Sequence, residues 1–328
     1  MIYMVWLPLL LPFLAGPAAG RLAHSLPPRR AAWLLAGTAV GLAAASTTAL
    51  ALLVIPGATH LHAVAVLGKL LTPLATGSPD SVIAVAVTAA GLLAWCAVSL
   101  GRALHRRLAQ LRRARRLAAR ADGELLVLRD DCPDAYALPG RPGRIVVTTG
   151  MLRTLSAEER EALFAHERAH LRERHHLYVA AVELAALCHP ALRTLREPLT
   201  YALERSADEA AAGAVGDRRL TARAIGKAAL ASRAAATRTA DRPGLALAAT
   251  AGPVPRRVAA LLDQPAGAAP GRPGNRRPHP RLAGHLIAAT LLACLALSAA
   301  ATVEAADDLH AGIEAAQGEA PQSGTQTR

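Results

Sequence analysis

Long apolar segments alternate with short polar segments in the first hundred residues, and another long apolar segment lies near the C-terminus. An α-helix needs roughly 20 mostly apolar residues to cross a bilayer. Four segments meet this requirement: residues 1–20, 31–55, 81–101 and 282–303. The first three contain no charged side chain, and the fourth has only His285 as a strongly polar residue. The pattern predicts four transmembrane helices.

The first segment also has an alternative interpretation, as a cleaved signal peptide. Pro8, Pro12 and Pro17 will bend or shorten a helix in this segment. However, no basic residue precedes the apolar run, and no small-residue cleavage site followed by polar sequence is evident. We therefore expect an uncleaved span, and whether it is retained stays open.

Residues 102–281 have the mixed pattern of a domain outside the bilayer. Short runs rich in Val, Ile and Leu, separated by Pro and Gly, predict strands at 124–128, 135–138 and 145–149. Ser156 and Glu159 form the capping-box pattern that opens a helix, which we expect to continue to about Cys188 and to end before Pro190.

Two more helices are expected after that one, the first from near Pro198 to Gly213 or Gly216 and the second at about 218–238. The fold class is thus a mainly α membrane protein with an α+β domain inserted between the third and fourth spans. The expected divisions are 1–101 for the first three spans, 102–262 for the domain, 263–281 for a basic Pro/Gly linker, 282–303 for the fourth span and 304–328 for a short tail.

The charge distribution predicts how the spans are oriented. The chain has 37 Lys and Arg against 24 Asp and Glu, a net charge of +13. Arginines concentrate at 21–30, 102–120 and 256–281, whereas 56–80 is balanced and 304–328 is acidic. Because short basic flanks stay in the cytoplasm, we expect the inserted domain to be cytoplasmic and both chain ends to lie outside.

The same arrangement explains the basic excess without nucleic acid. Arginines at 102–120 directly follow a span and suit anionic lipid headgroups, and only 3% of the residues are aromatic, which leaves few rings for bases to stack on. The stretch 61–75 is too short to span and is expected at the outer interface. The lipid bilayer is therefore an expected partner, and direct nucleic-acid binding is not.

Residues 166–170 read His-Glu-Arg-Ala-His, an HExxH motif inside the helix that the capping box opens. At 100° per residue, His166 and His170 lie 40° apart on one face and one turn apart along the axis, so both imidazoles can reach one metal ion at about 2 Å. Glu167 projects about 100° away and suits a general base that takes a proton from water. The motif predicts one zinc ion per chain.

A third ligand is needed, and two residues are candidates. Glu173 lies on the same helix beyond His170, and three ligands from one helix cannot readily surround a metal ion in tetrahedral geometry. Glu204, on the next long helix, is the better candidate, and Asp208 shares its face four residues later, where it can accept a hydrogen bond from a ligand imidazole. The prediction is therefore zinc on His166, His170 and Glu204, whereas the neighbouring His175, His176 and His189 are expected to pack or to lie on the surface.

HExxH followed by a helical ExxxD resembles the gluzincin arrangement of two related integral-membrane families. One comprises the HtpX and CAAX-prenyl proteases, and the other comprises the BlaR/MecR antirepressor metallopeptidases. Residues 134–140 and 144–152 resemble the strand-and-helix segment that precedes HExxH in both groups, and the resemblance is densest from 134 to 210. Three spans, a cytoplasmic zinc domain and a late fourth span resemble BlaR/MecR more closely, although only about 25 residues follow the last span here, and no penicillin-binding sensor can be present among them.

The resemblance implies a gluzincin zinc-peptidase domain in a multi-pass protein of a bacterial cell membrane. It implies an edge strand at Ala135 and Tyr136 on which a peptide substrate pairs by β-augmentation, and it implies that Arg257 steadies the substrate or oxyanion, unless that arginine is only a membrane-facing charge. By the same analogy the substrate is a protein, for example a winged-helix transcriptional repressor.

Two alternative functions stay open beside regulatory proteolysis by a zinc metalloendopeptidase. One is a quality-control protease of the HtpX kind with broad membrane-protein substrates. The other is a non-catalytic membrane signalling scaffold whose zinc site is structural, and such a site does not need Glu167.

Overall fold

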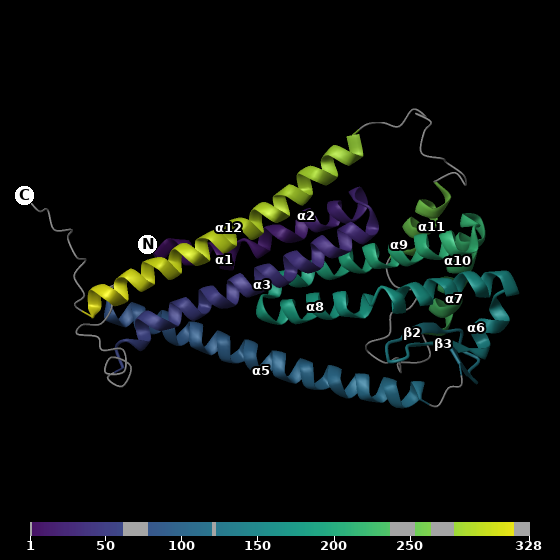
Figure 1. The fold of residues 1–328 in the computed structure, drawn as a ribbon, viewed down its shortest axis with the longest axis horizontal. Helices are drawn as coiled ribbons and strands as arrows, with labels where there is room; N and C mark the ends of the chain where they lie inside the picture. Colours follow the sequence, from purple (N-terminus) through teal and green to yellow (C-terminus); the bar gives the residue numbers. More distant parts are fainter. Residues whose placement is uncertain (1, 62–77, 120–122, 237–252, 264–278, 318–328) are drawn as a thin grey trace, which may run out of the picture.

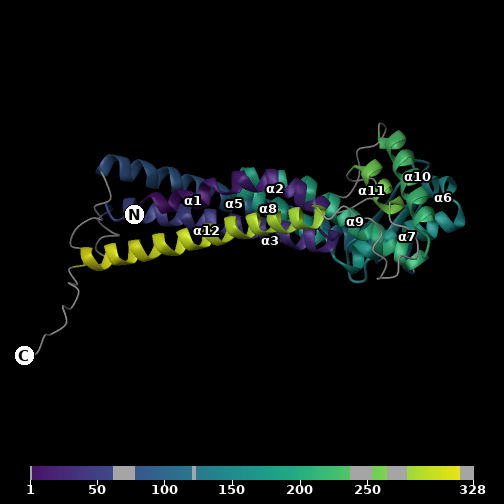
Figure 2. The same cartoon turned by 90° about the horizontal axis from the view of Figure 1, so that it is seen from above.

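The computed structural model describes residues 2–61, 78–119, 123–236, 253–263 and 279–317. A long helical bundle forms one end of the molecule and a mixed helix-and-sheet part forms the other (Figures 1 and 2). The predicted interfacial stretch 61–75 and the predicted linker 263–281 lie almost entirely outside the described residues.

The bundle contains the apolar segments that the sequence singles out. Its elements are η1 (Ile2–Trp6), α1 (Leu7–Leu10), α2 (Pro12–Ser25), α3 (Pro28–Ala58), α5 (Pro79–Ala118) and α12 (His279–Ala316). Among the described residues, four helical stretches are long and apolar enough to cross a membrane: Met4–Ser25, Pro28–Ala58, Pro79–Ala118 and Gly284–Ala316. The four predicted apolar helices are confirmed as helices of that length and composition.

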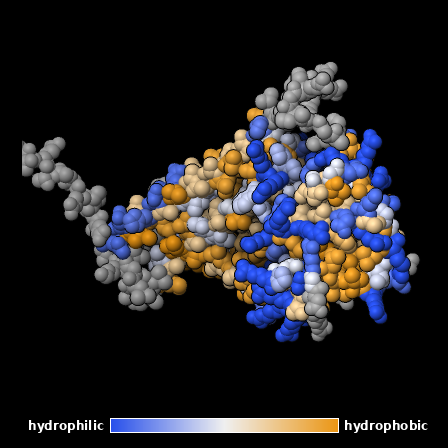
Figure 3. All heavy atoms as spheres, turned by 45° about the vertical axis from the view of Figure 1, so that its right-hand side comes forward, coloured by the Kyte–Doolittle hydropathy of each residue, from blue (hydrophilic) through white to orange (hydrophobic). Residues whose placement is uncertain are grey.

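Two of these helices extend well beyond their predicted ends. The arginine-rich segment after the third span continues it as the second half of α5, and α12 continues past Val303 to Ala316. The first half of the expected C-terminal tail is therefore helical. Figure 3 shows apolar residues covering much of the bundle, whereas hydrophilic residues gather on the part of the molecule that comes forward in this view.

The three predicted strands form one small sheet. They are β1 (Leu125–Leu128), β2 (Ala135–Leu138) and β3 (Arg144–Thr148), in the order β1-β3-β2. β1 runs parallel to β3, and β2 runs antiparallel to it with Tyr136 opposite Val146. β2 thus has β3 as its neighbour on one side and lies at an edge of the sheet.

The helices that follow the sheet are α6 (Thr149–Thr154), α7 (Ala157–Arg172), α8 (His175–Cys188), η2 (Pro190–Leu195), α9 (Arg196–Val215), α10 (Arg218–Ala236) and α11 (Val254–Leu262). The capping box of α7 is complete: Glu159 N–H donates to the Ser156 hydroxyl oxygen, and Ser156 N–H donates to the Glu159 carboxylate. Gly216, with φ 78°, ends α9 in the left-handed conformation that glycine adopts readily.

The prediction of one helix from Ser156 to about Cys188 is wrong. The chain leaves the helix after Arg172, and Arg174 adopts a left-handed conformation with φ 53° before α8 starts at His175. A non-glycine residue in this region is unfavourable by roughly 1 kcal/mol, so tertiary contacts must hold the break.

The hairpin formed by α8, η2 and α9 packs inside the bundle. Val182 of α8, Leu192 of η2 and Leu199 of α9 share one core with α2 and α3. At the tip of the hairpin, His189 Nε2 lies 3.0 Å from the carbonyl oxygen of Leu9, and Cys96 Sγ of α5 lies 3.7 Å from the Cys188 carbonyl oxygen. α9 continues from this contact with the bundle to the sheet-containing end (Figure 1), so one rigid helix joins the two ends of the molecule.

Candidate metal centre

α7 presents the HExxH residues to the interior of the molecule. His166 and Glu167 are fully buried, and His170 is 2% exposed. Leu163 and Phe164, one turn earlier, pack in a core with Ile145 of β3, so the helix is held with this face inward. His166 Nε2 and His170 Nε2 lie 3.1 Å apart, as expected for two residues four apart on one face.

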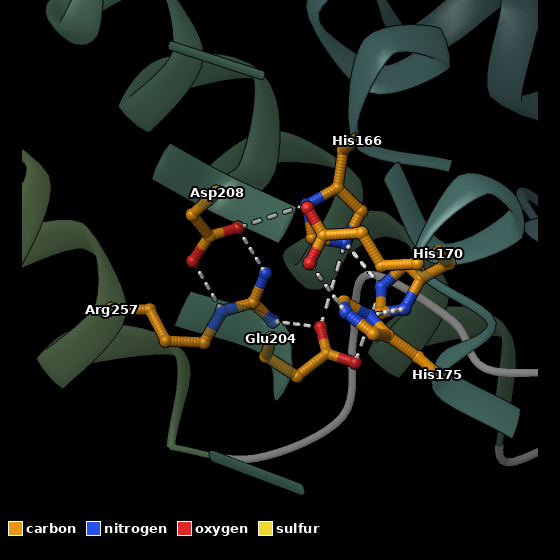
Figure 4. A network of polar contacts seen from close by, with 7 residues as sticks. His166, His170, His175, Glu204, Asp208 and Arg257 are labelled. Atoms are coloured by element: carbon orange, nitrogen blue, oxygen red, sulfur yellow. Dashed lines mark hydrogen bonds and ion pairs between the residues drawn. The ribbon is translucent and has the colours of Figure 1, made fainter. Parts of the chain in front are cut away.

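α9 brings Glu204 to these two imidazoles. Its carboxylate is fully buried, with Oε2 at 3.5 Å from His166 Nε2 and Oε1 at 3.6 Å from His170 Nε2. Among the described residues, His166, His170 and Glu204 form the one group of three or more potential ligands whose donor atoms all lie within 4.8 Å of one another. Figure 4 shows the three side chains pointing toward a common point.

The spacing of these donor atoms fits a zinc ion. Zinc bonds of 2.0–2.1 Å in a tetrahedron place the ligand atoms about 3.3–3.4 Å from one another. The two imidazole nitrogens lie 3.1 Å apart, one oxygen of Glu204 lies 3.5 Å from His166 Nε2, and its other oxygen lies 3.6 Å from His170 Nε2. Neither carboxylate oxygen of Glu167 has a hydrogen-bond partner of ordinary geometry in the part of the chain that the structure describes. Against the effect of burial, the backbone of Ala137 is close enough to lower the pKa of Glu167 slightly. A buried carboxylate with so few hydrogen bonds is costly, so this residue also fits a site that holds a cation and water.

Asp208 and Arg257 contact the candidate ligands on the side away from His170 and His175 (Figure 4). Asp208 Oδ1 lies 3.0 Å from His166 Nδ1, which leaves Nε2 of that ring free for a metal. Arg257, fully buried on α11, donates from Nε and Nη2 to the Asp208 carboxylate at 2.8 and 2.6 Å, and its Nη1 lies 2.8 Å from Glu204 Oε2.

The interpretation of Arg257 as a membrane-facing charge is therefore wrong. The sequence resemblance assigned it to the substrate or oxyanion, and that role stays a prediction. Its guanidinium contacts both the candidate ligand Glu204 and Asp208. Asp208 in turn contacts His166 on α7.

The charges of the site stabilise a positive charge among the ligands. Burial alone would lower the pKa of His166, but the hydrogen bond to Asp208 and the charge of Glu204 outweigh it and raise that pKa to about 9. Burial would raise the pKa of Asp208, but Arg257 outweighs burial and lowers it to about 2. The negative surroundings that retain a proton on His166 also favour a divalent cation at the same place.

Two neighbouring groups are shifted toward their neutral forms. Burial, strengthened by the charge of Glu204, raises the pKa of Glu167 to about 8. Burial, strengthened by the charge of His166, lowers the pKa of His170 well below its usual value. A neutral imidazole is the form that binds metal, and a carboxylate with a pKa near neutrality suits a general base.

The predicted substrate strand lies next to this site. β2 packs against α7, and the side chains of Ala135 and Tyr136 are buried at 4% and 8% exposure. A peptide paired with this edge strand would therefore meet its backbone rather than these side chains. Their role in substrate binding stays a prediction.

Sequence reasoning missed the residues around His170. His175 was expected to pack or to lie on the surface, and it is indeed buried. The expectation did not include its contact with His170, whose Nδ1 lies 2.8 Å from His175 Nδ1. Glu173 lies outside the ligand group, and its Oε2 lies 3.2 Å from His175 Nε2 and accepts a hydrogen bond from Ser206 at 3.1 Å. No sequence signal identified this network, because it depends on the break at Arg174.

Residues 100–290 match peptidase family M48, and the candidate ligands and Glu167 all lie inside this range. Searches of curated proteins and of solved structures found no match. Because the family match covers more than half of the 328 residues, the chain belongs to peptidase family M48, a family of zinc metallopeptidases.

Proposed function

We propose that this protein is a membrane-embedded zinc metalloendopeptidase that cleaves a regulatory protein on the cytoplasmic side of a bacterial cell membrane. The observation that carries the proposal is the convergence of His166, His170 and Glu204 beside Glu167, which is fully buried. A structural zinc site has no need of that carboxylate, whereas hydrolysis needs a base at this place.

Each residue of the site has a separate role in the proposed reaction. His166, His170 and Glu204 would hold one zinc ion, which would polarise the substrate carbonyl as a Lewis acid and would lower the pKa of water. Glu167 accepts a proton from the attacking water as the new carbon–oxygen bond forms. It then returns this proton to the leaving nitrogen as the peptide bond breaks. Asp208 and Arg257 keep His166 and Glu204 in place throughout.

The position of the basic segments supports the proposed orientation. The turn between α2 and α3, which carries Arg29 and Arg30 at its α3 side, the end of α5 and the start of α12 all lie toward the metal-site end of the bundle (Figure 1). Basic flanks stay cytoplasmic, so the site belongs on the cytoplasmic side. Both the start of α1 and the end of α12 lie at the opposite end.

The test of catalysis is Glu167→Gln in the purified full chain in detergent, with an unfolded protein as substrate. We expect kcat/KM to fall by about 10²- to 10⁴-fold, because general acid–base catalysis contributes about this much, while zinc stays near one per chain. Glu161→Gln, on the exposed side of the same helix, is the matched control and should keep full activity. Equal cleavage by the Glu167→Gln and Glu161→Gln variants would remove the enzymatic interpretation.

The substrate class rests on the resemblance to the BlaR/MecR family and needs a separate experiment. Cellular proteomes should be compared between strains that produce the wild type and the Glu167→Gln variant. Loss of one cytoplasmic repressor in the wild-type strain alone is expected for regulatory proteolysis. Accumulation of many membrane proteins in the variant strain would instead favour quality control.

A further inference from the structure

His170 makes an unusual contact with a second histidine that is not itself a candidate ligand. The two Nδ1 atoms lie 2.8 Å apart, and His175 is 2% exposed. In a continuous helix, residues five apart are separated by about 140° around the axis, so these rings could not meet. The left-handed Arg174 turns the chain between them, and Figure 4 shows the His175 ring against His170.

The hydrogen bonds of this pair have only one consistent direction. At 2.8 Å one of the two Nδ1 atoms must carry the proton. If His175 donated, its Nε2 would be unprotonated and would face the Glu173 carboxylate 3.2 Å away, which is repulsive. In addition, His170 Nε2 would then carry a proton, whereas metal binding needs a free lone pair on that nitrogen. Therefore His170 Nδ1–H donates to His175, and His175 Nε2–H donates to Glu173.

The far end of this chain is anchored on a different helix. Ser206 of α9 donates to Glu173 Oε2 at 3.1 Å, and Ser206 is 7% exposed. α9 also carries Glu204, two residues before Ser206. The network thus fastens the end of α7 to the helix that supplies the third candidate ligand.

We propose that His175 is a positioning residue for the metal centre. It sets the tautomer and ring orientation of His170, and it connects His170 to the Glu173 carboxylate through two successive hydrogen bonds. This inference rests on the proposed zinc site. It gives the two ligand imidazoles different supports: His166 faces a carboxylate directly, whereas His170 faces a neutral ring with a carboxylate behind it. Loss of a partner of this kind typically weakens metal affinity by about 10- to 100-fold.

The experiment measures the zinc dissociation constant of the full chain in detergent by competition with a chromophoric chelator. His175→Phe keeps a ring of similar shape but removes the acceptor, and should weaken zinc binding by about 10- to 100-fold. His175→Asn places an amide oxygen near the former Nδ1 and should recover most of the affinity. His176→Phe, at the neighbouring half-buried position, is the matched control and should bind like the wild type.

Two further readouts separate positioning from a merely structural role. The metal-free His175→Phe and His175→Asn variants should unfold at similar temperatures, and the Co²⁺-loaded His175→Phe variant should show a visible absorption spectrum that differs from that of the wild type. Equal zinc affinity in His175→Phe and His176→Phe would overturn the inference. So would a loss of affinity that His175→Asn does not restore. If the wild type itself binds no zinc, the proposed function falls as well, which distinguishes that failure from the other two.

Discussion

The guanidinium of Arg257 lies between two buried carboxylates of α9, Asp208 and Glu204. An arginine fork can donate to both at once, because its planar donors have a fixed geometry that lysine lacks. The charge of these two carboxylates raises the pKa of Arg257 further, against the effect of burial. The residue therefore compensates two negative charges that would otherwise be left in the interior.

We predict that Arg257→Lys weakens both the fold and the metal site. The variant keeps the charge but loses the fork, so one carboxylate is left without a partner; complete removal of a buried partner costs about 3–5 kcal/mol, and the lysine variant should lose part of this. Thermal unfolding and zinc affinity are the measurements. Arg256→Lys, at the exposed neighbouring position, is the control.

The same variant distinguishes two roles for this arginine. If Arg257 acts through Glu204 and Asp208, zinc affinity falls together with activity. If Arg257 acts only on the substrate or oxyanion, kcat falls while zinc affinity and unfolding temperature stay at wild-type values.

At the scale of elements, contacts at the start of α7 fix this helix, which carries the HExxH motif, relative to its neighbours. Glu159, which is buried, closes the capping box and also pairs with Lys227 of α10. The hydrogen bond from Lys227 is the main cause that lowers the pKa of Glu159, and the bonds to Ser156 add to it. A carboxyl with a lowered pKa in the folded state stabilises the fold above its unfolded pKa of about 4.3.

We predict that this contribution disappears as the pH falls from about 4.3 through the lower pKa of the folded state, because protonation removes the charge that Lys227 binds. Glu159→Gln should therefore unfold at a lower temperature than the wild type at pH 6, and the gap should narrow toward pH 3. The measurement is thermal unfolding of the metal-free chain in detergent. Glu158→Gln, at the exposed neighbouring position, should show no such pH-dependent gap.

α2 packs so closely on the hairpin of α8, η2 and α9 that one position has no room for a side chain. A Cβ at Gly16 would lie 2.6 Å from Thr194 Oγ1 and 3.0 Å from Thr194 Cβ, whereas a Cβ at Gly20 would meet nothing within 4 Å. The first apolar helical stretch is thus part of the packing around the helix that carries Glu204, and cleavage of this stretch as a signal peptide would remove that packing.

We predict that Gly16→Ala destabilises the protein by about 1–3 kcal/mol, the usual range for overpacking. Gly20→Ala on the same helix should be neutral or slightly stabilising, because alanine favours helices. Unfolding temperature in detergent measures both. Equal temperatures for the two variants would contradict the packing of α2 on η2.

At the scale of the whole molecule, the bundle and the metal centre form one connected structure. α9 is shared, since its first half lies in the core with α2 and α3 and its second half carries Glu204 and Asp208. Arg107 of α5 also pairs with Glu183 of α8. The site is therefore held to the apolar helices by the packing of α8 and α9 against them.

The proposed orientation predicts the outcome of reporter fusions in a bacterial host. Alkaline phosphatase, which is active only outside the cytoplasm, should be active when fused after Arg328 and inactive when fused after Ala118. Inactivity of the fusion after Arg328 would place both chain ends in the cytoplasm and reverse the orientation.

The sequence alone determined the features that depend on local periodicity. Four apolar helices follow from uninterrupted runs of apolar residues, the start of α7 follows from the Ser156–Glu159 pair, and the facing of His166 and His170 follows from the helical repeat of 100° per residue. Each of these depends on residues close together in the chain, so no knowledge of packing is needed.

Only the tertiary structure decided the remaining contacts, because they join residues that are distant in the chain or need a backbone conformation that packing imposes. Arg257 meets Asp208 across 49 positions of sequence. His175 meets His170 only because Arg174 is held in a left-handed conformation. The hairpin of α8 and α9 enters the bundle because its apolar side chains pack against α2 and α3, and an apolar face does not by itself specify its partner.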